Sequence, residues 1–271
     1  MISVLISRNE TPVQIGHFTD GTLKMNCPIP NDVGVATIRW CYESEEELVA
    51  LIHTVHHLRE HGIPTLHLDM PYIPNARQDR VQLDGEVFTL KSFAKVINWL
   101  NFSSVTVLDA HSRVSEALLD RVVNIMPHTA IREAIMRIKW DLGHENVVTF
   151  YPDEGAMKRY ASSHHYPTAF GMKTRNPETG KVDSLKIAGD TQSIAGSTVL
   201  IVDDICARGD TAYRSAKALR EAGAEHVYLF VTHCENTIFS SMIVEDDIIE
   251  KVFTTKSIYT GNNPKIEILP N

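Results

Sequence analysis

Two neighbouring carboxylates and a short glycine-containing loop form the stretch of this sequence with the clearest capacity for chemistry. Asp203 and Asp204 come directly after the apolar run 199–202, and Gly209 and Thr211 follow before a helical pattern begins. A strand, a tight loop and a helix N-terminus direct backbone N–H groups and a helix dipole at an anion such as a phosphate. The two carboxylates would repel that phosphate, so they suit ribose hydroxyls, a divalent cation, or both.

The alternative for this loop alone is an ordinary strand end, because Asp is common in loops and at helix N-caps. Two familiar phosphate-binding motifs are excluded. No Gly-Lys-Ser/Thr follows the glycine, so the loop is not a P-loop, and the three-glycine spacing of dinucleotide-binding folds is missing.

The elements that must position this loop alternate between apolar runs and helical patterns. Helices are predicted over residues 45–61 and 88–100, where apolar residues recur at i, i+3, i+4 and i+7. Strands are predicted over residues 1–6, 65–70, 105–108, 146–151, 199–202 and 226–232. This alternation predicts an α/β fold with mainly parallel sheets flanked by helices.

Polar residues gather just past the ends of the predicted strands. His111 follows the strand at 105–108, and Asp153 follows the strand at 146–151. In open α/β sheets ligands bind at the carboxyl ends of the strands. A structural histidine and a helix N-cap are the alternatives for these two residues.

Two groups of cations could bind phosphate. Arg77 and Arg80 follow a strand that ends in proline, and a guanidinium matches the geometry of phosphate oxygens. Lys173 and Arg175 lie two residues apart in a stretch that could form a β-hairpin, with residues 176–180 as its turn. A solvated loop and a surface strand are the alternatives.

Composition limits the class of protein. The chain has 271 residues, of which 43% are hydrophobic, and its net charge of −8 argues against nucleic-acid binding through bulk positive charge. Four scattered cysteines with no CxxC pair fit a reducing cytoplasm and suggest neither zinc nor disulfides. The first residues are too short for a signal sequence, and no apolar run approaches the ~18 residues of a membrane span.

Taken together, these elements resemble the ribose-phosphate pyrophosphokinase family, the synthases of phosphoribosyl pyrophosphate (PRPP). The matching segments follow the family's order over nearly the whole chain. They are Phe18-Thr19-Asp20-Gly21, Ala76-Arg77-Gln78-Asp79-Arg80, Asp109-Ala110-His111, Tyr151-Pro152-Asp153, Lys173-Thr174-Arg175 and the loop Asp203–Thr211.

The resemblance implies two phosphoribosyltransferase-like domains, each a mainly parallel sheet flanked by helices. The first, residues 1–140, would carry the ATP-binding loop, and the second, residues 141–271, the loop for ribose 5-phosphate. A weak core signal over residues 138–145 favours that boundary. The resemblance also implies a homo-oligomer, at least a dimer, with ATP and Mg²⁺ bound between the domains.

The implied reaction moves the β,γ-diphosphoryl group of ATP as a unit to the 1-hydroxyl of ribose 5-phosphate, giving PRPP and AMP. The resemblance implies that ATP is bound by Phe18, Asp20, Arg77, Gln78, Asp79 and His111, with Phe18 and Asp20 coming from a neighbouring subunit. Mg²⁺ would lie near His111 and Asp153, and Lys173 and Arg175 would stabilise charge on the transferring group. The residues implied for ribose 5-phosphate are Asp203, Asp204, Ala207, Arg208, Gly209, Asp210 and Thr211.

The ribose 5-phosphate loop departs from the family pattern at three of these positions. Ala207 replaces a carboxylate, Arg208 adds a cation able to reach the 5-phosphate, and Asp210 places a negative charge close to it. Two alternatives therefore stand beside a PRPP synthase: a non-catalytic regulatory relative, and a phosphoribosyltransferase that consumes PRPP. Retention of Arg77–Arg80, His111, Lys173 and Arg175 favours the synthase.

Overall fold

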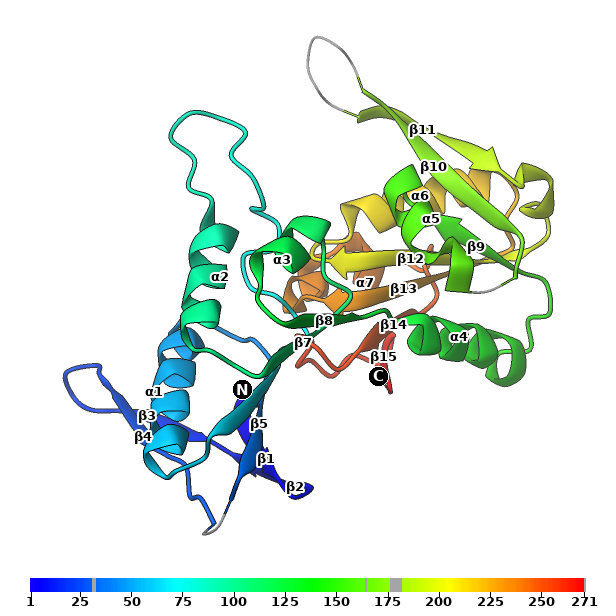
Figure 1. Ribbon diagram of the computed structural model, residues 1–271. Helices are drawn as coiled ribbons and strands as arrows, with labels where there is room; N and C mark the ends of the chain where they lie inside the picture. Colours follow the sequence, from blue (N-terminus) through cyan, green and yellow to red (C-terminus); the bar gives the residue numbers. More distant parts are fainter. Residues whose placement is uncertain (31–32, 164, 176–181, 271) are drawn as a thin grey trace. The chain divides into compact units, whose positions relative to one another are not determined.

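The chain forms two compact units, Met1–Met126 and Pro127–Asn271. The computed structural model describes residues 1–30, 33–163, 165–175 and 182–270 (Figure 1). Each unit has its own sheet and its own hydrophobic core. Helix α4 (His128–Met136) packs against strands of the second unit, so the contacts group it there, ahead of the predicted boundary at residues 140 and 141.

A six-stranded sheet forms the first unit, in the order β2-β1-β5-β6-β7-β8. β5 to β8 are parallel, whereas β1 pairs antiparallel with both β2 and β5. A separate two-stranded hairpin joins β3 to β4. The bounds are β1 Ile2–Ile6, β2 Asn9–Pro12, β3 Gln14–His17, β4 Leu23–Asn26, β5 Val35–Trp40, β6 Thr65–Asp69, β7 Ser104–Leu108 and β8 Val122–Ile125.

Three helices belong to this unit: α1 Glu46–Glu60, α2 Thr89–Trp99 and α3 Arg113–Leu118. Helix α1 buries Leu51, Val55 and Leu58 fully in the core, as their spacing predicts. The ring of His56 on α1 lies 5.7 Å from that of Trp99 on α2. The amphipathic helices thus cover the sheet that carries the polar strand ends.

A seven-stranded sheet forms the second unit, in the order β11-β10-β9-β12-β13-β14-β15. All neighbouring strands are parallel except β10 and β11, which form an antiparallel hairpin at one edge. The bounds are β9 Val147–Tyr151, β10 Thr168–Arg175, β11 Val182–Gly189, β12 Thr198–Cys206, β13 His226–Cys234, β14 Val252–Thr255 and β15 Ile266–Leu269.

The helices of this unit are α4, α5 Glu154–Tyr160, α6 Asp210–Glu221 and α7 Met242–Glu245, with a π-helical turn η1 at Arg137–Asp141 and 3₁₀ turns η2 Ala161–Ser163, η3 Thr191–Ser193 and η4 Asn236–Ser240. Helix α6 contacts β11, β12 and β13. It buries Ala212, Ala216 and Leu219 on the face that their spacing predicts. The central strands β12 and β13 are buried almost throughout because helices and loops cover both faces of a parallel sheet.

The α/β prediction and the two mainly parallel sheets are confirmed. Two strands are longer than their apolar runs indicate. β12 continues from Val202 to Cys206, so Asp203 and Asp204 lie within the strand and not in the loop after it. β13 likewise continues to Cys234. Hydrogen bonds between β12 and β13 stabilise both strands beyond their apolar runs. Hydrophobic periodicity does not predict this extension, because it depends on the pairing of distant segments.

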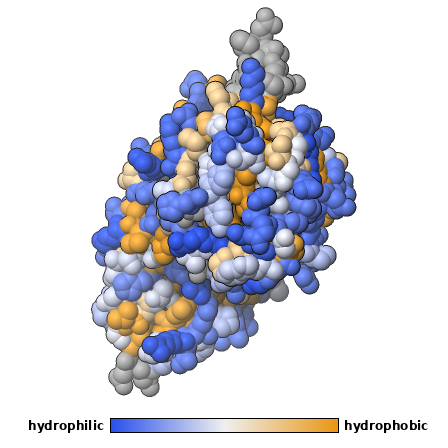
Figure 2. All heavy atoms as spheres, turned by 90° about the vertical axis from the view of Figure 1, so that its right-hand side faces the viewer, coloured by the Kyte–Doolittle hydropathy of each residue, from blue (hydrophilic) through white to orange (hydrophobic). Residues whose placement is uncertain are grey.

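The surface seen in Figure 2 is mostly hydrophilic, with small hydrophobic areas between polar side chains. Large apolar side chains such as Val35, Trp99 and Met172 are exposed, which is common on the surface of folded proteins. None of the described helices combines the length and hydropathy that a bilayer crossing requires.

Candidate active site

The two acidic side chains on β12 are held by local backbone hydrogen bonds. The Asp204 backbone N–H donates to Asp203 Oδ1 over 3.0 Å, and the Ile205 N–H donates to Asp204 Oδ1 over 2.7 Å. Arg159, in the last turn of α5, places its guanidinium nitrogen 3.9 Å from Asp204 Oδ2. The pair is therefore oriented before any ligand arrives, and Arg159 is a neighbour that the sequence analysis did not assign to the site.

Burial raises the pKa of Asp203 well above its ordinary value, and the negative charges of Asp204 and then Asp153 raise it further. The backbone hydrogen bond from Asp204 opposes this shift. A site that keeps three carboxylates together at the end of a parallel sheet favours a cation or a cluster of hydroxyl donors.

Asp153 serves as the N-cap of α5, because its Oδ1 accepts a hydrogen bond of 3.0 Å from the Ala156 backbone N–H. Asp153 therefore has the structural role of a helix N-cap. Its charge nevertheless acts on Asp203, so Asp153 also belongs to the acidic group at the strand ends. Gly171 of β10 permits this arrangement, because a Cβ there would lie 2.7 Å from the Pro152 carbonyl oxygen.

The loop after β12 ends in a left-handed glycine that begins α6. Gly209 has φ +75° and occupies the N-cap, where no side chain caps the helix. Asp210 is therefore the first residue of the helix rather than its cap, and it is exposed, as is Arg208. Backbone N–H groups at the start of α6, around Thr211, have no acceptor within the helix. Such N–H groups are able to donate to an anion.

We expect Gly209→Ala to destabilise the second unit by about 2–4 kcal/mol. A methyl group at this position would overlap Ile243 Cδ1 and would also force alanine into a left-handed conformation. Gly196→Ala is the matched control, because Gly196 has φ +70° with open space around its Cβ position. Thermal unfolding should show a loss of only about 1 kcal/mol for this control. Equal losses for both variants would contradict a packing role for Gly209.

Two cysteines lie beside this loop. Cys206 and Cys234 are register partners at the ends of β12 and β13, and both side chains are buried. Burial is the main cause that raises the pKa of each thiol, to about 12 for Cys234 and well above its ordinary value for Cys206. Both sulfurs are therefore protonated at neutral pH.

The arginine-containing segment of the first unit follows β6. Asp79 is buried and accepts two hydrogen bonds from its neighbour Arg80, of 2.6 Å from Nε and 3.0 Å from the terminal nitrogen. The Arg80 hydrogen bond is the main cause that lowers the pKa of Asp79. Arg77 is exposed, and Gln78 accepts a hydrogen bond of 2.7 Å from the Thr89 hydroxyl. Arg80 thus neutralises the Asp79 carboxylate.

His111 lies near this segment. After the larger effect of Arg80, the charge of His111 also lowers the pKa of Asp79, so the turn after β7 lies close to the arginine segment. Asp109 adopts φ +49°, and Asn124 Oδ1 accepts from the Ala110 N–H over 3.1 Å, which fixes this turn. The structure therefore brings together two of the predicted ATP-binding segments.

Phe18 and Asp20 lie elsewhere in the first unit, at the turn between β3 and β4. Asp20 Oδ1 accepts from the Thr22 backbone N–H over 3.0 Å and from its hydroxyl over 2.7 Å, which lowers the pKa of Asp20. The Phe18 ring is 55% exposed and lies 5.9 Å from Lys24 Nζ. The described contacts of Phe18 and Asp20 are therefore with residues of the β3–β4 hairpin.

Lys173 and Arg175 lie on β10, in the hairpin with β11, as predicted. Lys173 pairs with Leu185, and the register shifts between Thr174 and Arg175. The side chains of Lys173 and Arg175 lie outside the described part of the structure, as does the predicted turn at residues 176–180.

Similarity to characterised proteins extends along nearly the whole chain. This chain is 27% identical over 263 residues to the ribose-phosphate pyrophosphokinase of Thermococcus kodakarensis. The match covers 95% of this chain and 89% of the relative. The corresponding enzyme of Pyrococcus furiosus is also 27% identical, covering 96% and 90%. The chain thus resembles ribose-phosphate pyrophosphokinases along nearly its whole length.

Two further comparisons agree with this family. A phosphoribosyl transferase domain matches residues 161–255, which include the loop after β12. The fold is that of the phosphoribosylpyrophosphate synthetase from Mycobacterium smegmatis, with a TM-score of 0.75 and 20% identity, covering 96% of this chain and 86% of that structure. The two-sheet architecture thus agrees with the similarity to ribose-phosphate pyrophosphokinases.

Proposed function

We propose that this chain is a ribose-phosphate diphosphokinase that makes PRPP and AMP from ATP and ribose 5-phosphate. The observation that carries the proposal is the arrangement of β12 and α6, which joins an oriented acidic pair to a helix N-terminus through left-handed Gly209. Asp203 and Asp204 suit the ribose hydroxyls, and the backbone of Arg208–Thr211 suits the 5-phosphate.

In this reaction O1 of ribose 5-phosphate attacks the β-phosphorus of ATP. The O1–phosphorus bond forms, the bond from that phosphorus to the α,β-bridging oxygen breaks, AMP leaves and the hydroxyl proton is released. Catalysis requires mainly alignment and neutralisation of charge on the phosphoryl oxygens. Lys173 and Arg175 supply the positive charges in this proposal, and closure of such cations over the site would exclude water.

The first unit would contribute the nucleotide contacts. The exposed Arg77 would bind the polyphosphate, together with Gln78, Asp79 and His111. Phe18 is an exposed ring at a hairpin tip, which suits stacking on a base of a molecule bound by a second copy of the chain. This assignment makes the working enzyme a homo-oligomer, at least a dimer.

Mg²⁺ is the cation we propose for the reaction. Asp153, Asp203 and Asp204 fit this ion, because it prefers oxygen ligands and the charges of Asp153 and Asp204 already act on Asp203. His111 offers nitrogen and fits Mg²⁺ less well, so we assign it to the triphosphate rather than to direct coordination. When bound, Mg²⁺ supplies charge neutralisation on the phosphate oxygens.

The direct test is to incubate the purified chain with ATP, Mg²⁺ and ribose 5-phosphate and to measure AMP and PRPP. We expect both products in equal amounts, and none when ribose 5-phosphate is omitted. ATP binding without products would overturn the proposal in favour of a regulatory relative or another acceptor sugar. Consumption of added PRPP with a nitrogenous base would identify a phosphoribosyltransferase instead.

We expect Arg77→Ala to raise the KM for ATP by about 10-fold to 100-fold, because a charge-assisted hydrogen bond contributes about 1.5–3 kcal/mol. The KM for ribose 5-phosphate should stay within about twofold of its original value. Lys91→Ala is the control, since Lys91 is an exposed cation on α2 of the same unit. A rise confined to the KM for ribose 5-phosphate would show that the two substrate assignments are exchanged.

A further inference from the structure

A second group of chemically active side chains lies at the amino ends of the strands of the second sheet. The proposed ribose 5-phosphate loop lies at the carboxyl ends. His226 is the first residue of β13, Glu250 precedes β14, and His144 precedes β9. These strands are parallel with β12, whose carboxyl end carries the acidic pair. The three side chains therefore gather at the amino ends of the strands and take no part in the proposed phosphoryl chemistry.

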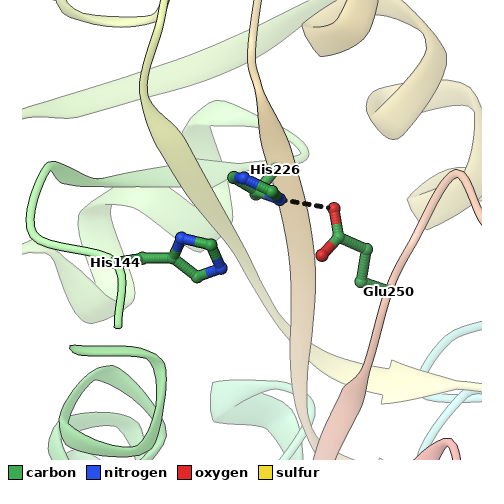
Figure 3. Close-up of side chains that lie close together, drawn as sticks. All are labelled: His144, His226 and Glu250. Atoms are coloured by element: carbon green, nitrogen blue, oxygen red, sulfur yellow. Dashed lines mark hydrogen bonds and ion pairs between the residues drawn. The ribbon is translucent and has the colours of Figure 1, made fainter. Parts of the chain in front are cut away.

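The three side chains face one another (Figure 3). One potential ligand atom from each residue lies within 4.8 Å of the other two. His226 Nδ1 is 2.9 Å from Glu250 Oε1, and the two imidazole rings are 4.0 Å apart between centroids. Tetrahedral ligands around Zn²⁺ are about 3.3 Å apart, given bonds of about 2.0 Å, so small side-chain rotations would close the site.

We propose that His144, His226 and Glu250 bind Zn²⁺, with water at the fourth position. Two imidazoles and one carboxylate form a ligand set of the kind that zinc uses, whereas Mg²⁺ prefers oxygen ligands in octahedral geometry. This ion is therefore chemically distinct from the Mg²⁺ proposed for the reaction, and it would bind at the opposite end of the strands.

The exposure of these groups favours the metal. His226 and Glu250 are about one-third exposed, at 34% and 31%, which leaves an entry path from solvent. Burial raises the pKa of Tyr228, and its hydroxyl stays protonated.

Surrounding side chains hold the ligands in place. The Tyr228 hydroxyl donates to Glu250 Oε2 over 3.0 Å and lies 3.0 Å from His144 Nε2. Arg220 donates to Glu250 Oε1 over 3.0 Å and orients the carboxylate. Its positive charge would also repel the bound Zn²⁺. The negative charge of Glu225 acts on His144 from the same region and offsets part of that repulsion. Such partners orient ligands and tune affinity in metal sites.

The consequence of occupancy would be a cross-link between three segments that are far apart in sequence. The segment before β9, the start of β13 and the segment before β14 would share one ion. Because the unfolded chain lacks this arrangement, zinc binding would stabilise the second unit. The proposed role is structural, so its test needs no catalytic readout.

The experiment measures thermal unfolding of the full chain, after removal of metal, with Zn²⁺ or Mg²⁺ added alone. At a Zn²⁺ concentration about 100 times the Kd, we expect the Tm to rise by about 5–10 °C. Dialysed protein should retain one equivalent of zinc, and Co²⁺ should give the visible absorption of a tetrahedral nitrogen–oxygen site.

His144→Ala should abolish the zinc-dependent rise in Tm and the Co²⁺ spectrum, and Glu250→Gln should weaken both. His144 lies between η1 and β9, outside any helix or strand, so we expect His144→Ala to fold. This variant still tests the proposal if Glu250→Gln is unstable on its own. His61→Ala is the control, because His61 is exposed at the end of α1 with its ring 4.3 Å from that of His57, a second place where zinc could bind.

Three outcomes would overturn the proposal. They are an unchanged zinc effect in His144→Ala, loss of the effect in His61→Ala, and an equal rise in Tm with Mg²⁺ at the same concentration. Failure of the PRPP assay would leave all of these measurements interpretable, because the zinc cluster is separate from the proposed substrate loop.

Discussion

Replacement of Lys173 by alanine is expected to lower kcat by about 100-fold to 1000-fold while the KM for ATP changes only a few-fold. The reason is that a cation on the transferring diphosphoryl group interacts more strongly with the transition state than with bound ATP. Lys173 lies on β10 in the hairpin with β11, where the ladder with Leu185 fixes its backbone. Initial-rate kinetics of AMP formation at saturating ribose 5-phosphate would measure the effect.

Lys186→Ala provides the matched control for this prediction. Lys186 is an exposed cation on β11 of the same hairpin, paired with Met172 of β10. Its removal changes the net charge of the hairpin by the same amount but should leave kcat within about twofold. Equal losses in both variants would indicate general electrostatic attraction of ATP, and unchanged turnover in Lys173→Ala would remove this residue from the mechanism.

Replacement of Asp203 by asparagine is expected to weaken ribose 5-phosphate binding and to stabilise the fold. The KM for ribose 5-phosphate should rise by about 10-fold to 100-fold, because an amide NH2 in place of a carboxyl oxygen leaves a ribose hydroxyl without its acceptor, which costs about 1–3 kcal/mol. The same variant removes a carboxylate that burial and the charge of Asp204 make costly to ionise. We expect stabilisation of about 1 kcal/mol at pH 8.

The sign of the pH dependence follows from the raised pKa of Asp203. Between the ordinary carboxylate pKa of about 4 and the raised value, the native state holds a proton that the unfolded chain has lost. Stability of the unsubstituted chain therefore falls as pH rises through this window. The advantage of Asp203→Asn should be small near pH 4 and should grow towards pH 8, as measured by denaturant unfolding at several pH values.

The exposed carboxylate of Asp190 gives the control for this stability effect. Asp190→Asn, in the same unit, should show a nearly constant difference from the unsubstituted chain across these pH values. A pH-independent effect of Asp203→Asn would contradict the shared burial of the acidic group.

Much of the fold follows from periodicity in the sequence. The spacing of Leu51, Val55 and Leu58 predicts the buried face of α1, and that of Ala212 and Ala216 predicts the buried face of α6. Short strands such as β8, β14 and β15 were not predicted. Each has only four residues, too few for a pattern to stand out, and each is held mainly by pairing with a parallel neighbour.

The candidate site was only partly accessible from the sequence. Motif order singles out Asp203, Gly209 and Arg77, because their chemistry depends on residue type and local spacing. The interaction of Arg159 with Asp204 depends on how α5 packs against β12, which no local pattern reports. The same reason hid the His144, His226 and Glu250 group, whose members come from three separated segments.

The buried pair Cys206 and Cys234 has a consequence for how the protein ages in an oxidising environment. Thiolates, not thiols, react with peroxides and electrophiles, and burial keeps both sulfurs protonated. Oxidation of either sulfur therefore requires the ends of β12 and β13 to open first. The rate of chemical inactivation is then set by local unfolding rather than by oxidant concentration alone, and any ligand that holds the loop closed also acts as an antioxidant for the enzyme.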